Sequence, residues 1–222
     1  MKKMFLAIAV VLILVMGMAG LSFGGTVDWA SWTSSGSSTA SGTIGSVGVT
    51  YTGELAFAQI NNTGTYYYTD ATKIAVGAPY TSATVANLPP TSDIIAIDGD
   101  ATTHTIIFSS PVTNPVMAIV SLGQSGVHTT YNFDQPFTIL SQGPGWWGGP
   151  GTLNASGNAL QGIEGDGTIQ FLGAYSTITW TGSSPEFWNG FTVGSPVPIP
   201  PSALLLGSGL LGLVGWRRFR KS

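Results

Sequence analysis

Glycine and proline recur so closely between residues 25 and 196 that few stretches are long enough to form a helix. Between them lie short runs rich in Val, Ile, Thr, Tyr, Phe and Trp, which are the residues that favour strands. Polar and apolar residues alternate in Thr168–Phe171 and Thr177–Trp180, as expected for half-buried strands. No stretch of this region shows a helical period, so the sequence predicts an all-β body.

Eleven runs have the composition and length of strands. They are Val47–Tyr51, Leu55–Ile60, Ile94–Asp98, Thr105–Phe108, Val116–Leu122, Thr129–Phe133, Phe137–Ser141, Ala159–Ile163, Thr168–Leu172, Thr177–Thr181 and Phe187–Val193. The run Val116–Val120 is continuously apolar, which predicts a central strand covered on both faces. Ser31–Gly48 is rich in Ser, Thr and Gly and is expected to be irregular or to form an edge. So many short strands predict an antiparallel β-sandwich of the jelly-roll type.

Charge and cysteine content restrict what this body can do. The chain has no cysteine, which excludes thiol catalysis and disulfides, so the body must be held together by packing alone. One lysine and ten acidic residues lie between residues 25 and 196, which gives this part a net charge of −9. A body of that charge is not expected to bind nucleic acid through its phosphates.

The C-terminus has three parts in a fixed order. The first is a proline-rich spacer, which favours an extended backbone and consists of Val197, Pro198, Ile199 and Pro200. The second is the apolar run Ser202–Trp216, whose 15 residues would form a helix of about 22 Å, shorter than a hydrocarbon core of about 30 Å. The third is a basic cluster that would remain in the cytoplasm and consists of Arg217, Arg218, Arg220 and Lys221. Alternatives are a plain membrane anchor or a buried pair of hydrophobic strands.

This spacer, apolar run and basic cluster resemble a PEP-CTERM sorting signal over residues 197–222. The commonest form of that signal has Glu between the prolines, where this chain has Ile199; Val-Pro-x-Pro is similar to a variant form. The resemblance implies that an exosortase-type membrane protease cleaves near Pro198–Pro200. It also implies a Gram-negative bacterium that produces exopolysaccharide, with the body released or attached at the cell surface.

Residues 1–24 have the features of a secretory signal peptide. Lys2 and Lys3 precede an apolar stretch from Phe5 to Met18, and small residues follow it. Their spacing suits cleavage by signal peptidase before Gly25 or before Gly20, and the alternative is an uncleaved N-terminal membrane helix. With basic residues at both ends, we expect the precursor to form a hairpin across the inner membrane, with its body exported by the secretion machinery.

The glycine- and proline-rich segment 143–151 contains the adjacent Trp146 and Trp147. Flat aromatic side chains can pack on the apolar face of a sugar ring. One hypothesis is therefore that this pair contacts carbohydrate, and the alternative is that it closes one end of the sandwich.

Other polar groups give weaker indications of chemistry. Carboxylates in Asp98–Asp100 and Glu164–Gly167 could hold Ca²⁺, although neither segment matches an EF-hand loop, and carboxylates beside glycine are also ordinary in turns. His104 and His128 are isolated and form no metal-binding pattern. No catalytic constellation stands out, so we expect no cofactor, no metal and no enzymatic activity.

These observations divide the chain into a signal peptide (1–24), a β-sandwich domain (25–196) and a sorting signal (197–222). We expect an exported, non-enzymatic protein of the cell surface or exopolysaccharide matrix. The first alternative is a secreted carbohydrate-binding module that uses Trp146 and Trp147. The second is a secreted hydrolase with a pair of carboxylates that the sequence does not mark.

Overall fold

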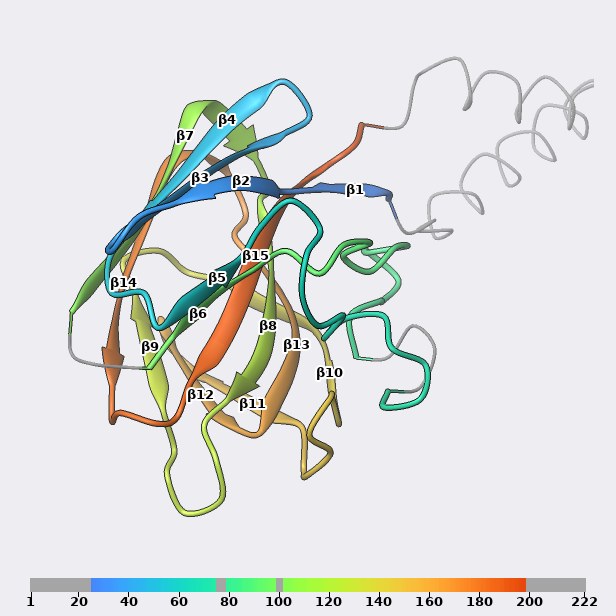
Figure 1. Ribbon diagram of the computed structural model, residues 1–222, viewed down its shortest axis with the longest axis vertical. Helices are drawn as coiled ribbons and strands as arrows, with labels where there is room; N and C mark the ends of the chain where they lie inside the picture. Colours follow the sequence, from blue (N-terminus) through green and yellow to red (C-terminus); the bar gives the residue numbers. More distant parts are fainter. Residues whose placement is uncertain (1–24, 75–78, 99–101, 199–222) are drawn as a thin grey trace, which may run out of the picture.

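The computed structural model describes residues 25–74, 79–98 and 102–198, which form strands and turns and contain no helix (Figure 1). The prediction of an all-β, antiparallel body is confirmed. The strands are β1 (Val27–Trp29), β2 (Ser31–Ser35), β3 (Thr39–Ile44), β4 (Val47–Thr52), β5 (Phe57–Gln59), β6 (Ile94–Ile97), β7 (Thr103–Thr113), β8 (Val116–Leu122), β9 (Thr130–Phe133), β10 (Thr138–Gly143), β11 (Thr152–Ser156), β12 (Ala159–Ile163), β13 (Gly165–Gln170), β14 (Ala174–Ser183) and β15 (Asn189–Pro196).

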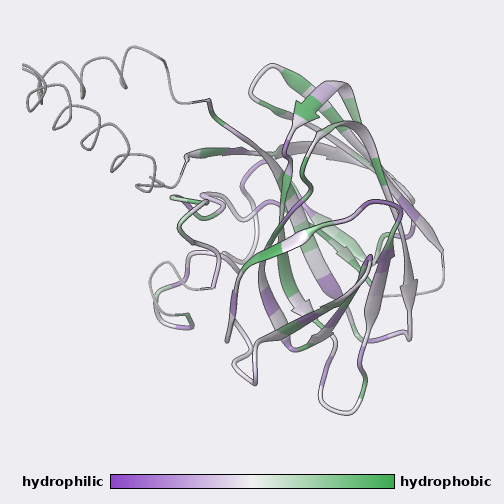
Figure 2. Ribbon diagram, turned by 180° about the vertical axis from the view of Figure 1, so that it is seen from behind, coloured by the Kyte–Doolittle hydropathy of each residue, from purple (hydrophilic) through white to green (hydrophobic). Residues whose placement is uncertain are grey.

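Two antiparallel sheets face one another in a β-sandwich-like arrangement (Figure 1). The first has the strand order β10-β13-β8-β15-β6-β5, with β1 paired to the end of β15. The second has the order β11-β12-β9-β14-β7-β4-β3-β2. Their inner faces share one apolar core, in which Trp180 of the second sheet meets Phe191 of the first with ring centroids 5.2 Å apart. Hydrophobic residues occur in strands throughout the body (Figure 2).

The strands from β6 to β15 pair in a nested order. β6 pairs with β15, β7 with β14, β8 with β13 and β9 with β12, all antiparallel. Successive strands of this set lie in alternate sheets, except β9 and β12, which share a sheet. The chain from β6 to β15 is therefore one long hairpin, wound so that its pairs fall alternately in the two sheets, with β10 and β11 inserted at its tip.

The strand β8 is covered on both faces, as its continuous apolar sequence predicts. Met117 and Ile119 belong to the core between the sheets. Val116, Ala118 and Val120 face the other way, into a second apolar cluster with Tyr68 and Tyr80 of the segment between β5 and β6. All seven residues of β8 are buried.

The segment Ser31–Gly48 forms an edge of the second sheet, as one of the two expectations had it, and it is regular rather than irregular. The composition of the segment does not reveal this regular strand structure, because the exposed positions of β2 and β3 are Ser and Thr. Trp32 anchors the segment: it is fully buried, and its Nε1 donates a 3.1 Å hydrogen bond to Oγ1 of Thr192. Its backbone N–H donates a 3.0 Å hydrogen bond to Oδ2 of the buried Asp93.

The two ends of the body lie side by side (Figure 1). Val27 of β1 is opposite Pro196 of β15, and the N–H of Val197 donates a 2.8 Å hydrogen bond to the carbonyl of Thr26. The segments that precede and follow the body therefore begin at the same end of the sandwich.

Several sequence predictions fall outside the described residues. They are the signal peptide 1–24, Ile199, Pro200, the apolar run Ser202–Trp216, Arg217, Arg218, Arg220 and Lys221. In the part of the chain that is described, no helix has the length and apolarity needed to cross a membrane.

Candidate functional site

An open pocket of about 390 Å³ lies at the opposite end of β15 from the two ends of the body. Four connections contribute to it: the end of β8 with the turn after it, the segment between β10 and β11, the turn between β12 and β13, and the segment before β15. The residues that line it are Ser121, Gln124, Trp147, Glu164, Glu186, Phe187 and Trp188. The fold thus collects aromatic and acidic side chains from distant parts of the sequence at one end of the sandwich.

Trp147 and Trp188 form the aromatic part of this pocket together with Phe187. The ring centroids of Trp147 and Trp188 are 6.3 Å apart, with the ring planes at 72°. Trp147 is 56% exposed and Phe187 is 89% exposed. The pocket therefore presents free ring surface to solvent, and contiguous exposed apolar surface of this kind often marks an interaction site.

Trp188 is held in place by two further rings. Phe57 lies 5.1 Å from it in an edge-to-face arrangement, and Tyr67 lies 5.1 Å away at 60°. Such aromatic pairs add about 0.5–1.5 kcal/mol to the free energy gained by burial. The half-buried indole of Trp188 is therefore held in a fixed position, and the more exposed Trp147 packs against it.

Trp146 has a different environment from its neighbour Trp147. It is half-buried, packs edge-on against Tyr67 with centroids 5.3 Å apart, and has the Nζ of Lys73 5.7 Å from its ring centroid. It does not line the pocket. Of the two adjacent tryptophans, Trp146 thus packs against the body, and Trp147 is exposed and lines the pocket.

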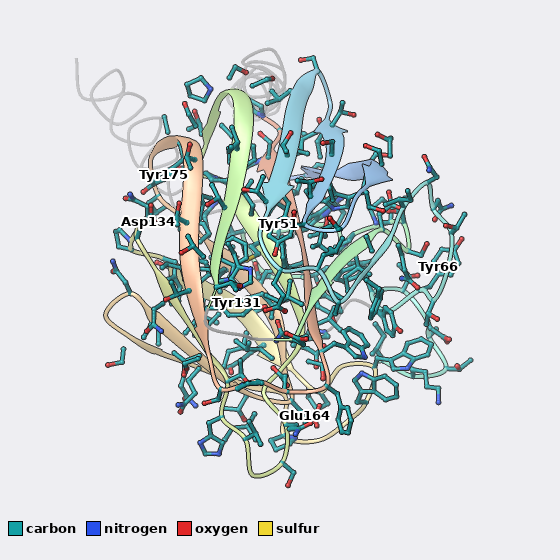
Figure 3. The ribbon with its side chains drawn as sticks, turned by 60° about the vertical axis from the view of Figure 1, so that its left-hand side comes forward. Tyr51, Tyr66, Tyr131, Asp134, Glu164 and Tyr175 are labelled. Carbon is teal, nitrogen blue, oxygen red and sulfur yellow. The ribbon has the colours of Figure 1, made fainter. Side chains whose placement is uncertain are left out.

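Glu164 enters the pocket from the turn between β12 and β13, at the lower end of the sandwich in Figure 3. Its Oε2 accepts a 2.9 Å hydrogen bond from Oγ of Ser121. Both residues have a left-handed backbone, with φ of 47° for Glu164 and 55° for Ser121. This conformation is costly for residues other than glycine and tends to be kept at functional sites. The contact between two such residues in one pocket supports a functional role for them.

Glu186 is the second carboxylate of the pocket and is held by hydrogen-bond donors from neighbouring segments. Its Oε1 accepts hydrogen bonds from the N–H of Gly123 at 2.9 Å and from Nδ2 of Asn189 at 2.8 Å. Burial raises the pKa of Glu186 to about 7 and the nearby charge of Glu164 raises it further, although the hydrogen bonds that its carboxylate accepts lower it. The buried Asn189 is fixed in turn by the hydroxyl of Tyr131, which donates to its Oδ1.

Asp166 lies beneath the segment that carries the two tryptophans. Its Oδ1 accepts a 2.8 Å hydrogen bond from Oη of Tyr80 and a 3.1 Å bond from the N–H of Ser121, and the N–H of Gly145 also donates to it. Burial raises its pKa to about 7. A Cβ on Gly145 would lie 2.1 Å from Cγ of Asp166, so only glycine fits at this position. Asp166 therefore fixes one end of the tryptophan segment.

Within residues 25–74, 79–98 and 102–198, the carboxylates considered as calcium ligands do not form a common site. Glu164 and Asp166 diverge, one into the pocket and the other into the interior beside Tyr80, and Gly99 and Asp100 lie outside the described residues. Among described residues no group of three metal-ligating side chains occurs.

The two histidines have separate surroundings. His104 is buried, stacks on Trp180 with centroids 5.2 Å apart, and its Nδ1 lies 2.8 Å from Oη of Tyr51. Burial lowers its pKa to about 4, so it is neutral at physiological pH. His128 is exposed in the turn between β8 and β9. His104 is thus a core residue, and it is not available to a surface site.

Sequence reasoning missed Ser121, Gln124, Glu186, Phe187 and Trp188. Ser121, Phe187 and Trp188 were included in predicted strands. One signal was present: Glu186–Trp188 places two aromatic residues directly after the turn-forming Ser183–Pro185, where strand burial alone does not require them. Comparison of the chain with family models, with curated proteins and with solved structures gives no match.

Proposed function

We propose that this protein is an exported, non-enzymatic component of the cell surface or exopolysaccharide matrix, and that its sandwich binds polysaccharide. The observation that carries the binding role is the pair of Trp147 and Trp188 in an open pocket with polar neighbours. Ring faces of sugars pack on flat aromatic surfaces, while Ser, Gln and Glu can accept or donate hydrogen bonds to sugar hydroxyls. Trp146 supports the segment, and Trp147 makes the contact.

The arrangement of the body supports export with later release or attachment. Because β1 and the end of β15 are paired, a signal peptide and a sorting signal would emerge at one end of the sandwich. Both could then enter the same inner membrane without disturbing the fold. The pocket lies at the far end of β15, so it would face away from the membrane while the precursor is anchored.

The resemblance of residues 197–222 to a PEP-CTERM signal supplies the expected partners. These are the secretion machinery, signal peptidase and an exosortase-type protease in the inner membrane of a Gram-negative bacterium. Val197 and Pro198 leave the sandwich directly after β15, and Val197 is 37% exposed. A protease could reach a site near Pro198–Pro200 without unfolding the body.

The jelly-roll type of sandwich belongs to this proposal. A jelly roll places eight strands in two sheets as two Greek keys. The nested pairs β6–β15, β7–β14, β8–β13 and β9–β12 give the sheets β6-β15-β8-β13 and β7-β14-β9-β12, which supports that assignment. β2, β3, β4 and β11 would extend the second sheet, and β1, β5 and β10 the first.

Export and binding are tested separately. The intact mass of the protein recovered from culture is expected to lack residues 1–24 and the sequence after the spacer; an unprocessed C-terminus would contradict sorting. Binding is tested by co-sedimentation of full-length protein, in detergent micelles, with exopolysaccharide from the producing cells. Trp147→Ala should reduce the bound fraction, whereas Leu172→Ala should not, since Leu172 is a 64% exposed apolar residue at the other end of β13. Equal binding by both variants would contradict the role of Trp147.

A further inference from the structure

The charges of the pocket restrict which polysaccharide it can take. Its two ionisable lining residues, Glu164 and Glu186, are both carboxylates. Lys73 is the single lysine or arginine of residues 25–74, 79–98 and 102–198, and it lies over Trp146, outside the lining. An anionic sugar such as a uronic acid would therefore meet carboxylates of its own sign with no cation to offset them.

The same two carboxylates are arranged to meet a cation. Glu164 interacts with Glu186 by charge repulsion, and the exposed Trp147 and the half-buried Trp188 complete the wall of the pocket. A bound ammonium group would relieve that repulsion and could also interact with an indole face. Oε1 of Glu186 is taken by Gly123 and Asn189, so its orientation is set before any ligand arrives.

We propose that the pocket binds an amino sugar unit of a polysaccharide, with its protonated amine between Glu164 and Glu186 and its ring against Trp147 or Trp188. This inference rests on the proposed polysaccharide-binding function and adds the class of sugar. Neutral sugars would use the same aromatic surface but would leave the two carboxylates without a counter-charge, and acidic sugars would be repelled.

The test compares three oligosaccharides of equal length by calorimetric titration into full-length protein in detergent micelles. They are a glucosamine tetramer, its N-acetylated counterpart, which is neutral, and a galacturonic acid tetramer, which is anionic. The glucosamine tetramer is expected to bind at least about tenfold more tightly than the N-acetylated one, as one charge-assisted contact of about 1.4 kcal/mol would give. Glu164→Gln and Glu186→Gln should each reduce that preference, and Asp28→Asn, which removes an exposed charge on β1, should leave it unchanged.

Two further arms separate the ways in which the proposal can fail. A lysine tetramer that binds as tightly as glucosamine, with no loss in Trp147→Ala, would mean attraction by overall charge and would overturn the amino sugar site. Equal affinity for the amine and its N-acetylated form would overturn the sugar class and leave the polysaccharide-binding function standing. If none of the three sugars binds and the native exopolysaccharide does not co-sediment, both proposals fail.

Discussion

Tyr80 donates a 2.8 Å hydrogen bond from Oη to Oδ1 of Asp166, and both side chains are buried. The two residues are 86 positions apart in the sequence. The contact joins the long segment between β5 and β6 to β13, directly beneath the segment that carries Trp146 and Trp147. The shape of the pocket therefore depends on a buried carboxyl group whose pKa is raised to about 7.

Stability should consequently fall as pH rises. Asp166 has a raised pKa in the folded state, so the folded protein binds its proton more tightly than the unfolded chain does. The contribution of Asp166 to the free energy of unfolding is complete below its ordinary pKa of 3.8 and is lost as pH rises through about 7. The raised pKa of Glu186 has an effect in the same direction between pH 4.5 and about 7. The contribution from Asp166 amounts to as much as about 4 kcal/mol. Thermal unfolding followed from pH 5 to pH 8 should show a decreasing Tm.

The matched variant is Asp166→Asn, which keeps an oxygen for Tyr80 and Ser121 and does not titrate. Its Tm should depend less on pH than that of the wild type and should exceed it at pH 8. A wild-type Tm that rises between pH 5 and pH 8 would show that Asp166 is not protonated in the fold at low pH.

Gly145→Ala should displace the tryptophan segment. The new methyl group would lie 2.1 Å from Cγ of Asp166, whose buried carboxyl is held by hydrogen bonds from Tyr80 and Ser121. Overpacking of this kind costs about 1–3 kcal/mol. Gly143→Ala is the control, since its methyl group would lie 3.4 Å from Cβ of Pro79, an ordinary contact. Denaturant unfolding should show a lower free energy of unfolding for Gly145→Ala and little change for Gly143→Ala. Equal losses would mean that the close approach to Asp166 is unimportant for stability.

Asn189→Ala should raise the pKa of Glu186 above its value of about 7. The amide of Asn189 donates a hydrogen bond to Oε1 of Glu186, and that bond stabilises the charged form. The substitution also leaves the buried hydroxyl of Tyr131 without its acceptor, at a cost of about 1–3 kcal/mol in the free energy of unfolding. The pKa can be followed by NMR from the side-chain carboxyl carbon of Glu186. An unchanged or lowered pKa would show that Asn189 does not control this carboxylate.

Tyr67→Ala should loosen the aromatic cluster more than Tyr66→Ala does. Tyr67 contacts both Trp146 and Trp188, at centroid distances of 5.3 and 5.1 Å, whereas Tyr66 is 41% exposed. Loss of a large partly buried aromatic side chain costs up to about 3 kcal/mol, less than in a full core. The Tm values of the two variants are compared by thermal unfolding. A larger decrease in Tm for Tyr66→Ala than for Tyr67→Ala would contradict the role of Tyr67 in the aromatic cluster.

Strand composition was enough to predict the centre of the fold. The apolar run of β8 and the run Ala159–Ile163, which is β12, appear with the bounds that the sequence predicted. The sequence did not reveal β1, which has only three residues, nor β11 and the regularity of β2 and β3, because the exposed positions of these strands are mostly Ser, Thr and Asn. Edge strands need little apolar sequence, since one side of each is unpaired and faces solvent.

The site was predictable only in part, because its residues come from four connections that are far apart in the sequence. Trp147 and Glu164 could be selected from their glycine-rich surroundings. Nothing local connects them with Ser121 or Trp188, which reach the same pocket from the end of β8 and the start of β15. Trp146 and Trp147 look equivalent in the sequence, and it is their different contacts, with Tyr67 and with Trp188, that separate their roles.

The proposed ligand site is the pocket that contains Trp147 and Trp188. The chain has seven tryptophans, and each has one indole N–H signal in a two-dimensional NMR spectrum. Full-length protein in detergent micelles should be titrated with short oligomers of the exopolysaccharide made by the producing cells. The signals of Trp147 and Trp188 are predicted to shift with the same dissociation constant, while those of the buried Trp29, Trp32 and Trp180 remain fixed. Saturable shifts confined to other tryptophans, or no shift at all, would contradict ligand binding at Trp147 and Trp188.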